Sequence, residues 1–597
     1  GWSSDNETVA GVDENGLVTA KAAGVAHITA TTADGGFTAS CTITVVAAIE
    51  PMTFYGRGSH SGVDIIYSIT RNTERHLVYT IHVKTEKEVS VQVNDDDYRT
   101  ATKENENYIY TSEAAYSDGE TVKGFFYMVF AGGAARVDFT YTVGAENAPI
   151  IYTATDASTL KEHTGVVLAE GAILTISADK ALGDIYVENG AVLNAEATLT
   201  ADNLYLSSQM GGGKSGQVRG AEKVTVKGDV YFDITFGDNA NPEKWHAFTV
   251  PFQVDALSGI YDTDNSKLTN EVNYAIMDYH GDVRATGKYG WKKYRGMLQP
   301  GTFYIMTVDG NRKTFRLKKA AGAALNNTSG MAVHQYAASG EGENGKDNGW
   351  NGIGNPSLVY GTIGVDVQVL NPATYTYELK EANTTNFTVG TPFFYQAAAD
   401  GTETLLATDA GKPNYAPARE SLSDKIYVGL SDGGYEDRVV LSASEDATTG
   451  YETGRDLVKL TMTDRPAVPQ IFAQGYGLNL CKMDAPLANN TATYPVMLYA
   501  PEAGEYTLSA RSGAEATVYL TKEGAVIWNL SATDYIVELD KGNNEGYGIL
   551  LKANAPQTPT DIDNIYGGVE TEKVLFEGNL YILHGGHTYD ATGKMIQ

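Results

Sequence analysis

Aromatic side chains are the residues of this sequence best suited to contact a ligand. Tyr289, Trp291 and Tyr294 lie within six positions, and residues 292–295 add Lys and Arg to an otherwise acidic chain. A flat ring can stack on a sugar while neighbouring Asp and Asn side chains supply hydrogen bonds. We therefore expect Trp291, with Tyr289 and Tyr294, to contact a sugar or a polyanion.

Trp245 and Trp350 are two further candidates for such an aromatic platform. Both lie in apolar surroundings, and a tryptophan in a β-sandwich usually packs in the core. A core position is therefore the favoured interpretation for these two residues, and a platform is the alternative.

One acidic turn imitates the start of a calcium loop. Asp262, Asp264 and Ser266 place oxygen atoms on alternate residues, as the first ligands of such a loop do. Two later positions depart from the pattern, because Lys267 replaces the Gly of the sharp turn and Asn273 replaces the bidentate Glu. A solvated turn is the favoured interpretation, with a structural Ca²⁺ as the alternative. We expect no other cofactor.

Patterns that resemble catalytic motifs fail on spacing or on context. Residues 211–215 read Gly-Gly-Gly-Lys-Ser, but a P-loop needs Gly six positions before Lys214, where Ser208 stands. In residues 58–62, His60 occupies the place of the serine in a nucleophile elbow. The ten histidines include no His-Glu-x-x-His pair for zinc. We therefore predict no catalytic residue, and we do not expect this sequence to be an enzyme.

The composition excludes several classes of partner. The 597 residues carry 44 Lys and Arg against 74 Asp and Glu, so a formal net charge of −30 would repel a nucleic acid. No apolar stretch approaches the ~20 residues that cross a bilayer, so we expect no transmembrane segment. Cys41 and Cys481 are too few for a disulfide framework or a four-ligand zinc site. Because the chain opens at Gly1 without Met or a leader, we expect a fragment or a processed form whose targeting signal lies upstream.

Short alternating apolar runs predict an all-β fold. Residues 79–83, 89–93 and 137–143 alternate between apolar and polar side chains, which is the pattern of half-buried strands. Turn-forming pairs such as Asn15-Gly16 separate these runs. The apolar run at 125–130 is continuous, and it predicts a central strand buried on both faces of a sandwich.

A repeat between residues 150 and 238 predicts a short parallel β-solenoid. Gly171 and Gly190 are 19 positions apart in similar turns, Ile185 to Leu204 is also 19, and Leu204 to Val224 is 20. Such spacing is typical of a chain that coils upon itself, here over three or four turns. We expect the flanking sandwiches to cap its ends.

The first 46 residues resemble a bacterial immunoglobulin-like domain of group 2. The resemblance rests on residues 2–6, 12–20, 24–30 and 41–45. Such domains are usually longer, so we expect a strand or two to be absent from this sequence. His27 departs from the Thr or Ser of the family, and we interpret it as a solvent-facing strand residue. In this family the modules act as spacers or adhesion modules on bacterial surfaces.

The later regions resemble parts of secreted and surface proteins of Bacteroidales-type bacteria. The resemblance rests on residues 245–252, 289–291, 301–305, 349–356, 437–441, 443–454 and 504–509. A Pro/Asn/Asp-rich linker at 555–564 leads to residues 573–594, which look like the short terminal tail of such exported proteins. The resemblance implies export or sorting for the tail, and the alternative is that the tail completes the last domain.

Together these features predict an all-β chain of serial β-sandwich modules with a short parallel β-solenoid segment. The predicted modules are a partial Ig-like domain at 1–47, a sandwich at 48–148, the solenoid at 149–240, sandwiches at 241–412 and 413–556, and a linker with tail at 557–597.

The predicted function is that of a non-catalytic surface or secreted bacterial protein, an adhesin-like or stalk region outside the cell or on its outer surface. A glycan or a host or cell-surface protein is the expected partner. One alternative is the accessory region of a larger exported enzyme, a glycoside hydrolase or a peptidase, whose catalytic domain lies upstream. The other is a carbohydrate-binding module.

Overall fold

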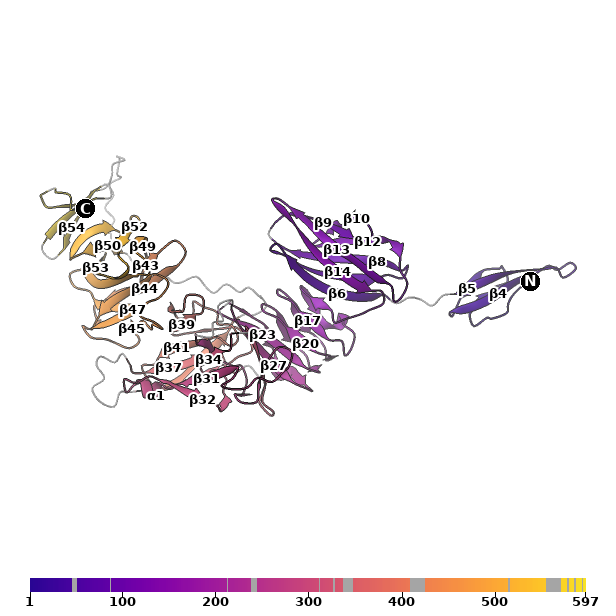
Figure 1. Cartoon of the computed structure of the whole chain (residues 1–597), viewed down its shortest axis with the longest axis horizontal. Helices are drawn as coiled ribbons and strands as arrows, with labels where there is room; N and C mark the ends of the chain where they lie inside the picture. Colours follow the sequence, from indigo (N-terminus) through magenta and orange to yellow (C-terminus); the bar gives the residue numbers. More distant parts are fainter. Residues whose placement is uncertain are drawn as a thin grey trace, which may run out of the picture. The chain divides into compact units, whose positions relative to one another are not determined.

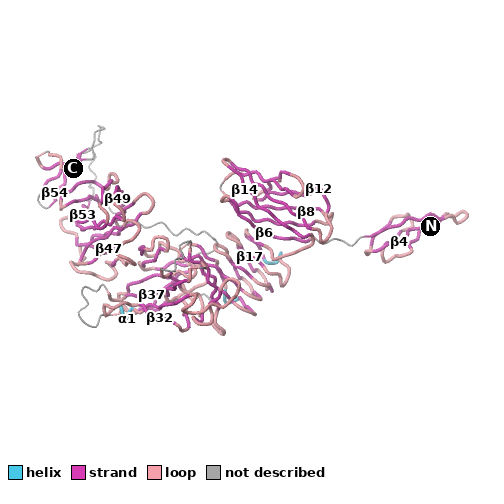
Figure 2. The backbone as a smooth tube through the Cα atoms, viewed as in Figure 1, coloured by secondary structure: helices cyan, strands magenta, loops and turns pink. Residues whose placement is uncertain are grey.

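Strands make up nearly all of the regular structure in the computed structural model, which confirms the predicted all-β class (Figure 1, Figure 2). The structure describes residues 1–45, 51–85, 87–211, 213–237, 244–310, 312–325, 328–336, 347–408, 425–513, 516–553, 571–576, 579–584, 587–592 and 594–596. The chain divides into two compact units, Gly1–Ile150 with Gly165–Val167, and Ile151–Thr164 with Leu168–Gln597.

The predicted module boundaries stay predictions. Those after residues 47, 240, 412 and 556, and the predicted linker at 555–564, lie outside the described residues.

The first unit begins with a small Ig-like domain. Its strands are β1 (Trp2–Ser4), β2 (Ala10–Val12), β3 (Val18–Ala20), β4 (Gly24–Thr31) and β5 (Thr38–Val45). They form a β1-β4-β5 sheet and a β2-β3 hairpin, whose turn contains Gly16 at φ 87° as the Asn-Gly pair predicts. Ala26 and Ile28 are buried. His27 faces solvent as predicted, with its Nδ1 2.8 Å from Asp5 Oδ2.

Two further sheets of the first unit enclose one core. Their strands are β6 (Met52–His60), β7 (Val63–Arg71), β8 (His76–Lys84), β9 (Val89–Asn94), β10 (Tyr98–Thr100), β11 (Thr102–Glu104), β12 (Asn107–Ala115), β13 (Thr121–Phe130) and β14 (Gly133–Thr142). The strand orders are β10-β9-β13-β14 and β11-β12-β8-β7-β6. The rings of Tyr79, Phe126 and Phe139 meet in the core.

The prediction that residues 125–130 form a strand buried on both faces is wrong for β13. Phe126 and Met128 are fully buried, but Val129 on the opposite face is 41% exposed. On that outer face, the guanidinium of Arg136 lies 3.8 Å from the ring centroid of Phe125. The prediction was wrong because the strand is central within its sheet but the sandwich has only two layers, so no second sheet covers its outer face.

The second unit begins with the predicted parallel β-solenoid, of about four turns. Its stacked strands are β16 (Ala154–Asp156), β18 (Ile173–Ile176), β19 (Lys180–Leu182), β20 (Ile185–Val187), β21 (Val192–Ala195), β22 (Leu199–Ala201), β23 (Leu204–Met210), β25 (Gln217–Arg219), β26 (Val224–Val226) and β27 (Val230–Phe236). Short 3₁₀ turns, η1 (Ala157–Thr159) and η2 (Ala221–Lys223), connect some of them. Strand β17 (Val166–Leu168) spans the boundary between the two units.

The strand register confirms one predicted repeat and corrects another. Ile185 pairs in parallel with Leu204, as the 19-residue spacing predicts. Leu204, however, pairs with Val230, and Val224 pairs with Leu199 in a different sheet. The last turn is longer because β24 (Lys214–Ser215) folds back antiparallel on the end of β23.

The end of the solenoid is capped by the following region. Strand β35 (Thr314–Lys318) pairs antiparallel with β27, and β30 (Ile260–Tyr261) pairs with β35. These strands cover the open edge of the last turn, as expected for a solenoid flanked by another module.

Two four-stranded antiparallel sheets dominate residues 244–408. The strands of the first are β28 (His246–Phe248), β34 (Tyr304–Val308), β31 (Tyr274–Tyr279) and β32 (Trp291–Tyr294), in that order. Those of the second are β37 (Trp350–Gly354), β41 (Pro392–Gln396), β39 (Val367–Asn371) and β40 (Thr376–Lys380). Smaller elements are α1 (Gly281–Arg284), β29 (Val254–Asp255), β33 (Met297–Leu298), β36 (Gly330–Val333), β38 (Gly361–Ile363) and β42 (Gly401–Ala407). Phe303, Trp350 and Phe394 lie in the core that these sheets share.

The described residues between 425 and 553 form one continuous mixed sheet around a large main core. Its strands are β43 (Ile426–Ser431), β44 (Glu436–Ser444), β45 (Leu457–Val458), β46 (Gln470–Gly475), β47 (Leu478–Pro486), β48 (Thr491–Ala500), β49 (Gly504–Ser512), β50 (Ala516–Lys522), β51 (Ala525–Asn529), β52 (Tyr535–Leu539) and β53 (Gly542–Ala553).

The tail forms a small sheet against this module. Its strands are β54 (Thr571–Phe576), β55 (Asn579–His584) and β56 (His587–Asp590). Val574 and Tyr581 are buried against Tyr519 and Val526. Thr588 is fully buried, and its hydroxyl donates a hydrogen bond to the Ile527 carbonyl at 3.0 Å. This packing favours the interpretation that the tail completes the last domain.

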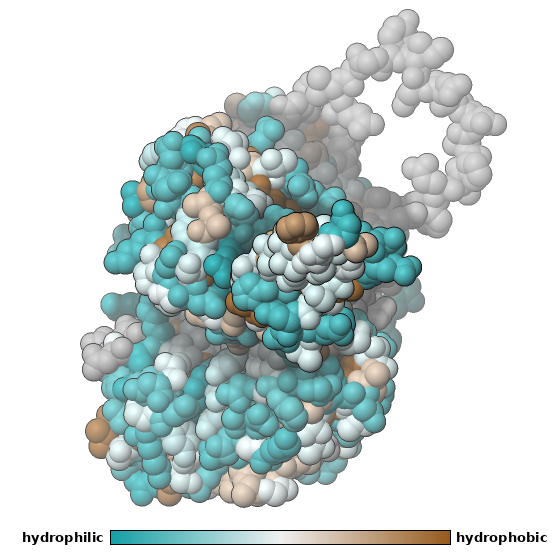
Figure 3. Space-filling view, turned by 90° about the vertical axis from the view of Figure 1, so that its right-hand side faces the viewer, coloured by the Kyte–Doolittle hydropathy of each residue, from teal (hydrophilic) through white to brown (hydrophobic). Residues whose placement is uncertain are grey.

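One face of the molecule is largely hydrophilic (Figure 3). On this face, Figure 3 shows hydrophobic residues scattered among hydrophilic ones. In the part of the chain that the structure describes, no helix is both long enough and apolar enough to cross a membrane.

Candidate functional site

Tyr279 and Trp291 meet because β31 and β32 pair antiparallel with these two residues directly opposite each other. Directly opposed side chains project from the same face of a sheet. Their ring centroids lie 5.2 Å apart, with the planes at 69°. Trp291 also makes edge-to-face contacts with Phe303 and Phe394. Packing therefore holds the indole ring in one orientation.

These rings line an open cavity of about 430 Å³, which we name the Trp291 cavity. Its aromatic and charged lining residues are Trp245, Tyr279, Arg284, Lys288, Tyr289, Trp291, Asp347, Tyr377 and Phe394. The volume lies within the roughly 300–1,000 Å³ typical of small-molecule sites. The cavity is thus large enough for a ligand and combines ring surfaces with charges of both signs.

The charged groups of the Trp291 cavity are fixed by an ion pair. Arg284, at the end of the short helix that follows β31, places Nε 3.4 Å from Asp347 Oδ1 and its guanidinium 4.8 Å from the Trp350 ring centroid. Burial raises the pKa of Tyr279, and the nearby Arg284 opposes that rise. The buried Tyr279 hydroxyl has no well-aligned hydrogen-bond partner among the described residues, and Arg284 lies near enough only for a weak one.

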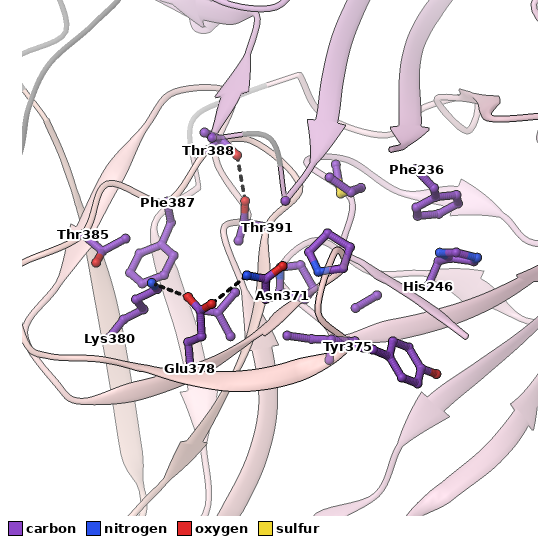
Figure 4. A pocket seen from close by; sticks show the side chains of 18 of the residues that line it. Phe236, His246, Asn371, Tyr375, Glu378, Lys380, Thr385, Phe387, Thr388 and Thr391 are labelled. Carbon is purple, nitrogen blue, oxygen red and sulfur yellow. Dashed lines mark hydrogen bonds and ion pairs between the residues drawn. The ribbon is translucent and has the colours of Figure 1, made fainter. Parts of the chain in front are cut away.

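A second cavity, of about 240 Å³, lies between the end of the solenoid and the β39–β40 hairpin, and we name it the Tyr375 cavity (Figure 4). One end is aromatic, because the rings of Phe236 and His246 stack with centroids 4.9 Å apart. The Tyr375 hydroxyl accepts a hydrogen bond from the Trp245 backbone N–H at 3.2 Å. The Lys244 ammonium lies 4.9 Å from the Tyr375 ring centroid.

The other end of the Tyr375 cavity carries a polar network. Asn371 Nδ2 donates to Glu378 Oε1 at 2.6 Å, and Lys380 Nζ lies 2.8 Å from Glu378 Oε2, as Figure 4 shows. Burial pushes the pKa of Glu378 up, but the charge of Lys380 and hydrogen bonds from Asn371, Lys380 and Tyr435 outweigh this effect. The pKa of Glu378 therefore lies below its ordinary value, and the carboxylate is ionised at neutral pH.

The structure brings together two of the three aromatic residues predicted from sequence. Trp291 and Tyr289 both line the Trp291 cavity, and Tyr289 is 72% exposed at its rim. Tyr294 does not line it, because positions three apart on a strand face opposite sides. Its ring contacts Tyr304 at 5.4 Å, and its hydroxyl donates to the Met297 carbonyl.

The basic run after Trp291 is paired with an acidic residue of the same module. Lys293 Nζ lies 3.2 Å from Glu271 Oε1, and Arg295 Nη2 lies 2.6 Å from the same oxygen. Their hydrogen bonds and charges lower the pKa of Glu271. The positive charges of Lys293 and Arg295 are therefore partly offset by Glu271.

The two other tryptophans differ in their positions. Trp350 is fully buried, which confirms its predicted core position. Trp245 is half-buried: it packs against the same core, but it also lines both the Trp291 and the Tyr375 cavities. The core interpretation is therefore correct for Trp350 and incomplete for Trp245.

The predicted calcium turn is held by protein groups. Asp262 Oδ2 lies 2.9 Å from Arg312 Nε, and Asp264 Oδ1 accepts a hydrogen bond from the Ser266 backbone N–H at 2.8 Å. The hydrogen bonds from Ser266 lower the pKa of Asp264. Arg316 donates to the Thr263 carbonyl on the same turn. Among the described residues, no group of three or more His, Cys, Asp or Glu is placed to hold a metal ion. The calcium site stays a prediction.

Sequence patterns gave no indication of several lining residues. Arg284 and Tyr377 line the Trp291 cavity and Tyr375 lines the other one, and they come from a short helix and a hairpin that lie far apart in the chain. Tyr294 is three positions from Trp291 on β32. Had the extent of this strand been known, the spacing would have excluded Tyr294 from the Trp291 cavity.

An aromatic ladder on the solenoid is a different kind of feature. Tyr186, Tyr205 and Tyr231 stack on one another with centroids 4.3 and 5.0 Å apart. Tyr205 is covered by a ring on each of its two faces. The ladder stabilises the stacking of successive turns.

Comparison with known proteins identifies one family. The model of the bacterial Ig-like domain (group 2) matches residues 1–43. No curated protein matches the chain. A solved structure of surface layer protein SbsC, domains 4–9, aligns with 10% identity over 92% of this chain and 89% of that chain, at a TM-score of 0.11. Such a TM-score indicates no shared arrangement of the two chains.

Proposed function

We propose that this chain is a non-catalytic, multidomain surface or secreted bacterial protein of the stalk or adhesin type. The observation that carries the proposal is the Ig-like family match at residues 1–43, followed by β-modules in series. A series of β-rich modules suits a spacer or adhesin region. The resemblance of the later modules to Bacteroidales-type surface proteins supports the same assignment.

Immunolabelling of the source bacterium tests this location. Antibodies against residues 51–143 should label intact cells, and brief protease treatment of intact cells should remove the signal. A cytoplasmic protein serves as the control, since it should be labelled only after permeabilisation. If this chain also requires permeabilisation, the surface or secreted assignment is wrong.

The alternative of an accessory region in a larger exported enzyme is tested by the gene. A coding sequence that continues upstream into a hydrolase or peptidase domain would favour it over a stand-alone stalk.

A second candidate function is carbohydrate binding at the Trp291 cavity. The supporting observation is that Trp291 and Tyr289 line one cavity together with Arg284, Asp347 and Lys288. Sugar rings have apolar faces that pack on aromatic rings and hydroxyl groups that need donors and acceptors at their edges. This cavity offers both within one concave surface.

A glycan array of the whole chain tests the second candidate. Trp291→Ala should lower the signal of a bound glycan roughly ten-fold. Tyr294→Ala is the matched control, because Tyr294 lies on the same strand and faces away from the cavity. Equal signals from the Trp291 variant and the unmodified protein would eliminate this site.

A further inference from the structure

We propose that the Trp291 cavity and the Tyr375 cavity are adjoining subsites of one cleft that binds a linear oligosaccharide. The inference rests on the proposed carbohydrate binding at Trp291 and extends it from a single sugar to a chain.

Trp245 is the wall that the two cavities share. Trp245 lines both, and its backbone N–H donates to the hydroxyl of Tyr375. Tyr289, at the rim of the Trp291 cavity, is close enough to Tyr375 for its charge to contribute to the raised pKa of that residue, after the larger effect of burial. The two cavities therefore adjoin at Trp245.

The volumes of the two cavities support their use by a single ligand. The Tyr375 cavity, at about 240 Å³, is smaller than the roughly 300–1,000 Å³ of typical small-molecule sites. Beside the Trp291 cavity of about 430 Å³, it adds room for a further ring of the same ligand.

The polar groups of the Tyr375 cavity are already ordered. Glu378 is held between Asn371 and Lys380, so an acceptor and a cationic donor stand in fixed positions. Fixed groups suit sugar hydroxyls, which donate and accept, because binding then needs little side-chain ordering.

The row of cavities extends one step further. Glu378, Lys380 and Thr385 also line a third cavity, of about 310 Å³, which Glu436 and Arg438 line as well. A ligand that reaches Glu378 and Lys380 would therefore have further polar groups nearby, which a single sugar at Trp291 would not use.

Calorimetric titration of the whole chain with a length series of a glycan identified on the array tests the inference. Affinity should rise roughly ten-fold from the disaccharide to the hexasaccharide, since another ring contact and its hydrogen bonds are added. Tyr375→Ala should bring hexasaccharide affinity down to the disaccharide level while leaving the disaccharide unchanged. Thr385→Trp, which fills the cavity without removing a core residue, should have the same effect. Tyr294→Ala is the control.

The outcomes separate this inference from the one on which it depends. If the disaccharide and the hexasaccharide bind equally, or if both cavity variants bind the hexasaccharide as the unmodified protein does, the extended cleft is wrong while the Trp291 site stands. If no glycan binds the unmodified protein, both proposals are wrong.

Discussion

Trp291 lies directly opposite Tyr279 across strands β32 and β31, and the two rings meet edge to face at 5.2 Å. This single register position orients both rings toward one cavity. It also turns Tyr294, three residues along, to the other face of the sheet.

The buried hydroxyl of Tyr279 gives a prediction about stability. Tyr279→Phe should leave the unfolding midpoint of this module unchanged or raise the free energy of unfolding by about 1 kcal/mol, because it removes a buried polar group that has no well-aligned partner among the described residues. Tyr274→Phe, on the same strand, is the control. Its hydroxyl donates to the Ala256 carbonyl at 2.7 Å, so its loss should cost about 1 kcal/mol. Thermal denaturation followed by calorimetry measures both, and a larger loss in the Tyr279 variant would contradict the assignment.

The Glu378 network predicts a pH-dependent contribution. The folded-state pKa of Glu378 lies below its ordinary value of 4.5, so its stabilising effect is complete above that value and is lost as the pH falls through the lower folded-state pKa. Glu378→Gln should therefore lower the unfolding midpoint at pH 7, with the difference shrinking below pH 4.5. Midpoints measured from pH 7 to pH 3 check this. A difference that stays constant over the range would show that lost packing, and not the charge, is responsible.

Arg316 joins the solenoid to the strands that cap it. Its Nε and Nη2 bind Asp233 at 2.8 and 2.7 Å, and its guanidinium lies 4.8 Å from the Tyr205 ring centroid. Lysine cannot reproduce this planar two-point contact. Arg316→Lys should therefore lower the stability of the solenoid region by about 2 kcal/mol.

Arg295→Lys is the matched control for this substitution, because Arg295 is exposed on the surface and binds Glu271 through one nitrogen. It should change stability by under about 1 kcal/mol. Hydrogen exchange of the β27 and β35 amides would localise the effect, and faster exchange should be confined to the Arg316 variant. Equal effects of the two lysine substitutions would refute the proposed role.

The two cysteines should differ in reactivity. Cys41 is exposed, whereas burial raises the pKa of Cys481 to about 12, so its thiolate is scarce at neutral pH. A thiol reagent should modify only Cys41 in the folded protein and both residues in denaturant, as mass spectrometry can show. We also expect reductant to leave the unfolding transitions unchanged. Rapid modification of Cys481 in the folded chain would contradict this assignment.

Sequence patterns correctly predicted those features that depend on residues close together in the sequence. Alternation predicted strands such as β8 and β14, the Asn15-Gly16 pair predicted a hairpin turn, and the 19-residue step predicted the pairing of Ile185 with Leu204. The prediction failed for Val224, because a local insertion, β24, lengthened one turn of the solenoid. It failed for the run at 125–130, because a continuous apolar run does not reveal how many layers cover a strand.

The sequence by itself determined the all-β class, the solenoid and the candidacy of Trp291 and Tyr289, since periodicity and residue type are local properties of the chain. Only the tertiary structure decided that Tyr279 faces Trp291, that Tyr294 faces away, and that Trp245 stands between two cavities. Such relationships depend on the register between strands and on which sheet packs against which. The register and the sheet packing are set by the burial of apolar side chains over the whole module, so no short stretch of sequence determines them.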